Sequence, residues 1–313
     1  MHSRTTQPAR RARPLRALSI ITAGLVFGSG LTACAASADD RPLIVVTTNI
    51  LGDVVGELVG DEARVMTLMA PNADPHSFEI SAREAARIID AELVVSNGVG
   101  LEEGLTQHLE TASAEGVPIV EAGSLVDVLQ TTSGTDDPHF WTDPRQMVSV
   151  VKGVAVALRE EVPGIDGSTL ETNVEQYLSD LETLDAEMAS AFAAIPAEHR
   201  KLVTNHHVFG YLAERYDFEV IGAVIPSGTT LAAPSASDLD ELSSAIEDAG
   251  VRTIFADSSQ SDRLVQVLAD EAGVDVAVVA LFTESLTDAD GEAPTYLSMM
   301  RANTERIATG LSP

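Results

Sequence analysis

Four histidines lie in sequence contexts from which an imidazole could bind a metal ion. His76 and His139 both follow an Asp-Pro pair in turn-rich segments, and the neighbouring residues His206 and His207 follow a short apolar run. Neutral imidazole is a common ligand of divalent transition metals. An isolated loop histidine is usually solvated, but the repeated Asp-Pro-His context favours a shared role. The other histidines lie in a leader, in a helix pattern and in a polar turn: His2, His108 and His199.

A metal site of this kind requires secondary structure that brings distant segments together. Short apolar runs alternate with helix-like segments along both halves of the chain. Uninterrupted apolar strands separated by helices predict parallel sheets that are buried on both faces. We expect strands at 43–48, 64–69, 92–96, 117–121, 201–204, 218–224, 252–256 and 276–281. We expect helices at 50–59, 81–90, 100–114, 208–216, 236–249, 261–272 and 295–310, with Gly273 ending the helix at 261–272.

These elements place the candidate histidines where strands end. His76 follows the expected strand 64–69, and His206 directly follows the expected strand 201–204 and opens a helix. Ligands of open α/β sheets bind beyond the carboxyl ends of the strands. We therefore expect the histidines to converge in a cleft between two lobes.

One expected helix is too long to belong to a repeating strand–helix unit. Residues 168–194 carry apolar side chains at helical spacing without an internal Gly or Pro, which predicts a rigid helix about 40 Å long. We interpret it as a connector between two α/β lobes with mostly parallel sheets. The expected organisation is a signal peptide at 1–33, a tether at 34–41, an N-terminal lobe at 42–167, the connecting helix at 168–195 and a C-terminal lobe at 196–313.

The N-terminal segment has the pattern of an export signal. Five arginines precede an apolar run, and no acidic residue occurs before Cys34. Cys34 is the only cysteine in the protein, so that an intrachain disulfide is excluded. The segment Leu-Thr-Ala-Cys that ends at Cys34 resembles the lipobox of bacterial lipoproteins, which implies acylation of this cysteine. No later segment is apolar for the roughly 20 residues that a transmembrane helix needs.

The charge of the chain excludes one class of partner. The sequence has 19 basic and 48 acidic residues, and removal of the signal leaves a net charge of about −34. A chain this acidic offers no phosphate-neutralising face, so we expect no nucleic-acid binding. Because few of the acids lie near the histidine motifs, we interpret most of them as solubilising surface residues.

Four ordered sequence blocks resemble a known family. They are ADPHSFE around His76, DPHFWTDP around His139, TNHHVFGYLAERY around His206, and FTESL followed by YLSMM around Glu284. Together they are similar to the zinc/manganese ABC-transporter solute-binding proteins, from about residue 43 to the C-terminus. The resemblance implies a monomeric extracytoplasmic protein, lipid-anchored to the outer face of the cell membrane or periplasmic. Its two lobes would hold one metal ion and deliver it to a membrane permease driven by an ATPase.

The resemblance also implies a ligand set. His76, His139, His206 and Glu284 occupy the four ligand positions of the family. His207 falls where the family often has an acid, and Asp257 is a weaker candidate that could orient a ligand. Because adjacent residues entering a helix point about 100° apart, we prefer His206 over His207.

The donor types favour zinc over manganese. Three imidazoles and one carboxylate suit tetrahedral Zn²⁺, whereas Mn²⁺ prefers more oxygen ligands. The stretch 130–137 lacks the long histidine-rich insertion that many zinc members carry, which weakens this preference, so that manganese remains the alternative. Ligating histidines need a partner on the second ring nitrogen, and we expect nearby carboxylates to supply it, with the candidates Asp74, Asp137 and Asp143.

A zinc-dependent hydrolase is the alternative from another functional class. Catalytic zinc sites keep one coordination position open, whereas Glu284 would fill the fourth position here. His76 and Glu79 lack the second histidine of a helical protease motif. We therefore expect a binding protein and not an enzyme.

Overall fold

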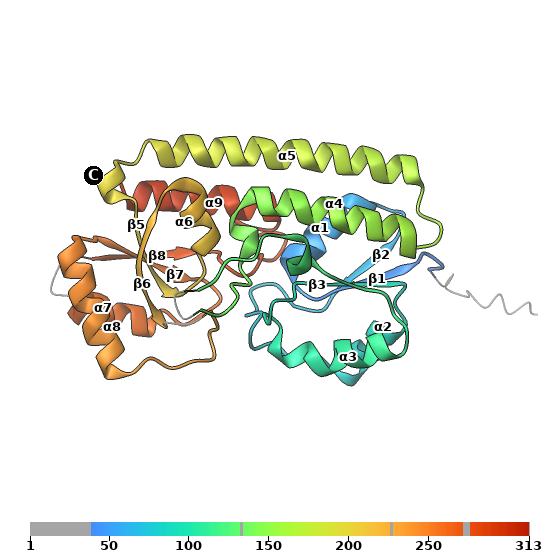
Figure 1. Ribbon diagram of the computed structural model, residues 1–313, viewed down its shortest axis with the longest axis horizontal. Coiled ribbons are helices and arrows are strands. Elements are labelled where there is room, and N and C mark those ends of the chain that lie inside the picture. The colour runs from blue at the N-terminus through green and yellow to red at the C-terminus, as the bar shows by residue number, and fades with distance from the viewer. Residues whose placement is uncertain (1–38, 132–133, 226–227, 272–275, 313) are drawn as a thin grey trace, which may run out of the picture. The chain divides into compact units, whose positions relative to one another are not determined.

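The chain forms two four-stranded parallel sheets in the part that the structure describes. The computed structural model describes residues 39–131, 134–225, 228–271 and 276–312. The first sheet has the strand order β2-β1-β3-β4 and the second has the order β6-β5-β7-β8. Figure 1 labels strands of both sheets. Helices connect the parallel strands within each sheet, as the crossover rule for parallel pairs requires. The predicted α/β fold with two lobes is confirmed, and we call the units built on these sheets the first and second lobes.

The first lobe buries its sheet on both faces. Its strands are β1 (Leu43–Val46), β2 (Arg64–Thr67), β3 (Leu93–Ser96) and β4 (Ile119–Glu121). Its crossover helices are α1 (Asn49–Val59), α2 (Ala82–Ile89) and α3 (Thr106–Ala114). Successive residues of β1 enter different apolar clusters, Ile44 with α1 and Val45 with Ile88 of α2. This two-sided burial explains why the central strands read as continuous apolar runs.

The second lobe repeats the arrangement. Its strands are β5 (Lys201–His206), β6 (Glu219–Ile225), β7 (Thr253–Asp257) and β8 (Ala277–Leu281). Its helices are α6 (Gly210–Tyr216), α7 (Ala236–Ala249), α8 (Arg263–Glu271) and α9 (Tyr296–Gly310). The expectation for His206 was wrong, because this residue is the last of β5 and α6 begins only at Gly210.

Two long helices lie beside the lobes. Helix α5 (Gly167–Ala193) falls on the expected connector and packs against α1, α4 and α9 (Figure 1). Helix α4 (Pro144–Glu161) is absent from the elements expected above, although Asp143 caps it and proline occupies its first turn. One continuous apolar cluster joins residues of both sheets to one face of α5, and that face consists of Leu170, Tyr177, Leu181, Leu184, Met188 and Phe192.

Some expectations concern residues outside the described part of the chain. The expected signal at 1–33, Cys34 and Gly273 all lie there, as does most of the tether. Of the helices that the structure does describe, none is both long enough and apolar enough to cross a bilayer.

The shared core predicts that α5 stabilises the folded protein through its buried face. Leu181 is fully buried, and Leu181→Ala should lower the free energy of unfolding by about 2–5 kcal/mol because it leaves a cavity. Val156 on α4 is 54% exposed, so Val156→Ala should change the free energy of unfolding by less than about 0.5 kcal/mol. Urea denaturation measures both, and equal small effects would contradict a tightly packed α5.

Candidate metal centre

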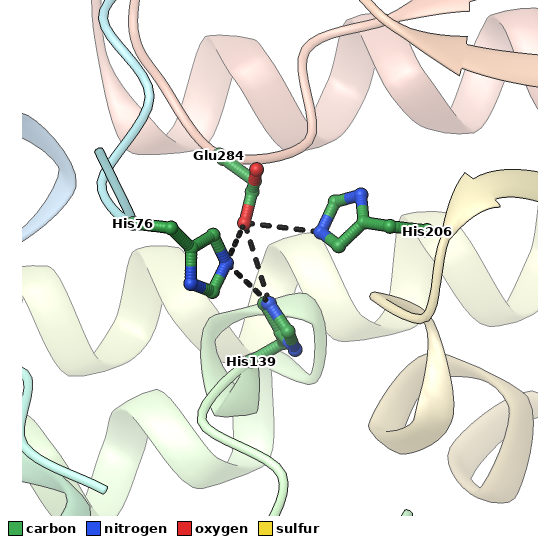
Figure 2. A group of neighbouring side chains, drawn as sticks. All are labelled: His76, His139, His206 and Glu284. Carbon is green, nitrogen blue, oxygen red and sulfur yellow. Dashed lines mark hydrogen bonds and ion pairs between the residues drawn. The ribbon is translucent and has the colours of Figure 1, made fainter. Parts of the chain in front are cut away.

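Four side chains from distant parts of the sequence meet at one buried point. One nitrogen or oxygen atom from each of His76, His139, His206 and Glu284 lies within 4.8 Å of the others (Figure 2). None of the four residues is more than 2% exposed. The sequence prediction that these residues converge is therefore matched by their positions.

The three histidines all present the same ring atom to one carboxylate oxygen. Glu284 Oε1 lies 2.9 Å from His76 Nε2, 3.1 Å from His206 Nε2 and 3.3 Å from His139 Nε2. The Nε2 atoms of His76 and His139 are 3.4 Å apart. Three nitrogen donors and one oxygen donor thus surround a single position, as a four-coordinate ion requires.

Local turns fix the two histidines of the first lobe. Asp74 accepts the backbone N–H of His76 at 2.9 Å and the hydroxyl of Ser77 at 2.8 Å, which closes the turn after Pro75. Asp137 accepts the backbone N–H of His139 at 3.0 Å. In each Asp-Pro-His motif the aspartate therefore orients the histidine that follows two residues later (the proline supplies the fixed φ between them).

The second lobe contributes its two residues from strand ends. His206 closes β5, pairs with Ile225 of β6, and its carbonyl accepts the hydroxyl of Thr204 at 2.6 Å. Glu284 lies in the loop between β8 and α9. Both residues are at the carboxyl edge of the second sheet, where parallel strands leave room for a ligand.

The charges of the site are strongly coupled. Burial alone would lower the pKa of His139, but its hydrogen bonds to Asp137 and Glu284 outweigh burial and raise that pKa to about 9. Burial would raise the pKa of Glu284, yet the charge of the nearby His206 and the close contacts of its carboxylate with all three imidazoles hold that pKa well below its usual value. The site therefore stabilises positive charge at the point where the four side chains meet.

Several buried atoms of the cluster lack hydrogen-bond partners. They include Glu284 Oε2, His76 Nδ1 and both ring nitrogens of His206. His206 Nε2 is close to Glu284 Oε1, but the pair lacks hydrogen-bond geometry. Leaving a buried polar group unsatisfied costs about 1–3 kcal/mol. A cation bound by the Nε2 atoms and the carboxylate would compensate part of this cost, so the residues present fit a metal ion.

Asp137 is the carboxylate that holds a ring nitrogen. Its Oδ1 lies 2.7 Å from His139 Nδ1, and its Oδ2 lies 3.6 Å from Nε2 of His207. Holding Nδ1 orients the His139 ring so that Nε2 faces the centre. His207 lies outside the four-residue cluster and on the other side of this aspartate.

The other predicted carboxylates have different contacts. Asp257 is buried and accepts the N–H of Ser259 at 2.5 Å and the hydroxyl of Thr283, next to Glu284 in sequence. Burial and the charge of Glu284 raise the pKa of Asp257 to about 7. Asp143 accepts the N–H of Arg145 at 2.8 Å as the N-cap of α4. Asp74 accepts the backbone N–H of His76 and not a ring nitrogen, and His76 Nδ1 has no hydrogen-bond partner. The expectation that a carboxylate holds a histidine ring therefore fits Asp137 and was wrong for Asp74 and Asp143.

Trp141 contacts both His139 and the loop that carries Glu284, and it was not among the predicted site residues. Its ring lies edge-on to His139 with centroids 5.3 Å apart, and its indole N–H donates to the carbonyl of Thr283 at 2.8 Å. Its proximity to His139 in sequence was visible, but its contact with residue 283 depends on the tertiary fold.

Comparison with known proteins gives a consistent match over nearly the whole described chain. Residues 44–310 match the family described as zinc-uptake complex component A, periplasmic. The chain is 30% identical over 289 residues to the zinc-binding protein TroA of Treponema pallidum (strain Nichols), covering 88% of this chain and 91% of that protein. It is 26% identical over 296 residues to the manganese-binding lipoprotein MntA of Halalkalibacterium halodurans, and the match covers 94% of this chain and 96% of that protein.

A solved structure agrees with this match. The periplasmic zinc-binding protein TroA from Treponema pallidum superposes with a TM-score of 0.82 at 28% sequence identity. The alignment covers 87% of this chain and all of that chain. Both lobes are therefore included in the similarity.

Proposed function

This chain belongs to the family of periplasmic zinc-uptake components, and on that premise we propose that it captures a divalent transition metal outside the cytoplasm for delivery to an ABC permease and its ATPase. Two lobes with a buried donor cluster between their sheets suit capture of a single ion. The ion is the transported substrate, and the chain releases it unchanged. The family consists of transport components, so the hydrolase alternative is rejected.

The observation that carries this proposal is the convergence of three imidazole Nε2 atoms on one carboxylate oxygen. We propose His76, His139, His206 and Glu284 as the metal ligands. A buried divalent ion needs compensating negative charge. Glu284 supplies one charge directly, and Asp137 supplies a second through the His139 ring. The two positive charges of the ion are thus balanced within the site.

We propose zinc as the preferred ion. Three nitrogen ligands and one oxygen ligand suit tetrahedral zinc, whereas manganese favours oxygen-rich, octahedral sites. The name of TroA supports zinc and that of MntA supports manganese. Manganese therefore remains the second candidate.

The first prediction from the proposed function concerns metal binding by the wild-type protein. A soluble form that begins at Ala35 should bind one zinc ion tightly and manganese much more weakly, because four donors fill a tetrahedral shell. Calorimetry with chelator competition measures both affinities. The fluorescence of Trp141, whose ring lies against that of His139, provides an independent signal. Absence of tight binding of either ion would contradict the proposed function, and tighter manganese binding would reverse the order of the two metals.

The second prediction separates the two adjacent histidines. Only His206 belongs to the donor cluster, while His207 lies near Asp137. His206→Ala should therefore weaken zinc binding far more than His207→Ala, which serves as the matched control. Competition with a chelator of known zinc affinity measures both variants. Equal losses would show that the choice of His206 as ligand is wrong.

We further propose that the protein is attached to the membrane by a lipid on Cys34. The support is the lipobox-like sequence that ends at this residue and the lipoprotein names of relatives. The third prediction is that the wild-type protein incorporates a labelled fatty acid and sediments with membranes, whereas Cys34→Ser does neither. Incorporation by both proteins, or by neither, would contradict attachment at Cys34.

A further inference from the structure

We infer that Asn49 is a positioning residue for Glu284, because its side-chain amide joins the loop of Glu284 to the segment that leads to His76. The inference rests on the proposed metal-binding function. Asn49 is the first residue of α1 and is only 8% exposed. It lies more than 230 positions before the Glu284 loop, with which it forms hydrogen bonds.

The amide of Asn49 contacts both segments directly. Its Oδ1 accepts the backbone N–H of Leu286 at 3.0 Å, and its Nδ2 donates to Ser285 Oγ at 2.8 Å. Nδ2 also donates to the carbonyl of Ala70 at 3.2 Å. The acceptor and donors of one side chain thus connect the two residues after Glu284 to the segment that follows β2 and precedes His76.

A backbone hydrogen bond runs beside this connection. The N–H of Asn72 donates to the carbonyl of Leu286 at 2.9 Å. On the other side of Glu284, Trp141 donates to the carbonyl of Thr283 at 2.8 Å. Groups of the first lobe therefore hold the chain immediately before and immediately after Glu284, although Glu284 follows a strand of the second lobe.

The amide of Asn49 is free for this role because another residue caps its helix. The hydroxyl of Thr48 accepts the N–H of Leu51 at 3.3 Å as the N-cap of α1. Both Ser285 and Leu286 are buried. Loss of the amide would leave the Leu286 N–H without its acceptor in a buried place, and the loop would have to shift to satisfy it.

A small shift of this loop matters because metal ligands tolerate little displacement. Ligand distances in real sites fall within about 0.2 Å of their preferred values. Glu284 Oε1 must stay near all three Nε2 atoms at once. Asn49 therefore acts on the ion through Glu284 and not by contact with it.

The test is a double-mutant cycle on the soluble protein, with zinc as the probe. Asn49→Ala should weaken zinc binding about 10–100-fold, as loss of groups that orient metal ligands does. In a Glu284→Ala background the same substitution should change zinc affinity less than about twofold, because interaction energies vanish when the partner is absent. Asn173→Ala is the matched control, since Asn173 donates to the Leu58 carbonyl at 3.1 Å near the other end of α1. It should leave zinc affinity unchanged.

The possible results are distinct. An equal loss of zinc affinity from Asn49→Ala in both backgrounds, or no loss in either, would overturn the inference about Asn49. The proposed function would still stand in that case, provided that the wild-type protein binds zinc tightly. Failure of the wild type to bind a metal tightly would overturn both. If Asn49→Ala does not fold, as judged by thermal unfolding, Ser285→Ala tests the same connection. It removes one Asn49 hydrogen bond and should weaken zinc binding about threefold, again only when Glu284 is present.

Discussion

One oxygen atom of Glu284 lies between the ring nitrogens of three histidines, at a point where all four side chains are almost fully buried. Imidazoles brought together in this way repel when protonated and leave lone pairs unsatisfied when neutral. A buried carboxylate in turn needs a positive charge beside it. A divalent cation would meet both needs at once, which is the physical basis of the proposed metal binding.

The fold supplies the positions that this interaction requires. Two parallel sheets direct their carboxyl ends toward the same region, so that short loops from each can carry a ligand. Asp74 and Asp137 fix the histidines of the first lobe through local turns. Helix α5 packs on a core shared by both lobes, which limits how far the two sheets can separate. Precise ligand placement thus depends on residues that never contact the ion.

Much of the architecture could be predicted because it depends on local patterns. Continuous apolar strands indicated parallel sheets, and 27 residues of helical spacing indicated α5. Helix α4 was missed although Asp143 and Pro144 mark its start. Asp143 was instead named as a candidate to hold a histidine ring, because a carboxylate that lies near a histidine in the sequence looks the same whether it caps a helix or holds a ring. Only its contact with Arg145 distinguishes these roles.

The sequence by itself determined the sheets, the long helix and the types of donor atoms, since each follows from residue chemistry and short-range spacing. Tertiary structure decided which atoms meet. His206 is the last residue of β5 and His207 is the next residue along the chain, and sequence adjacency alone does not say which of the two faces Glu284. Only packing shows that His206 faces Glu284 while His207 faces Asp137. The bonds from Asn49 to Ser285 and Leu286 likewise join residues whose separation leaves no periodic signal in the chain.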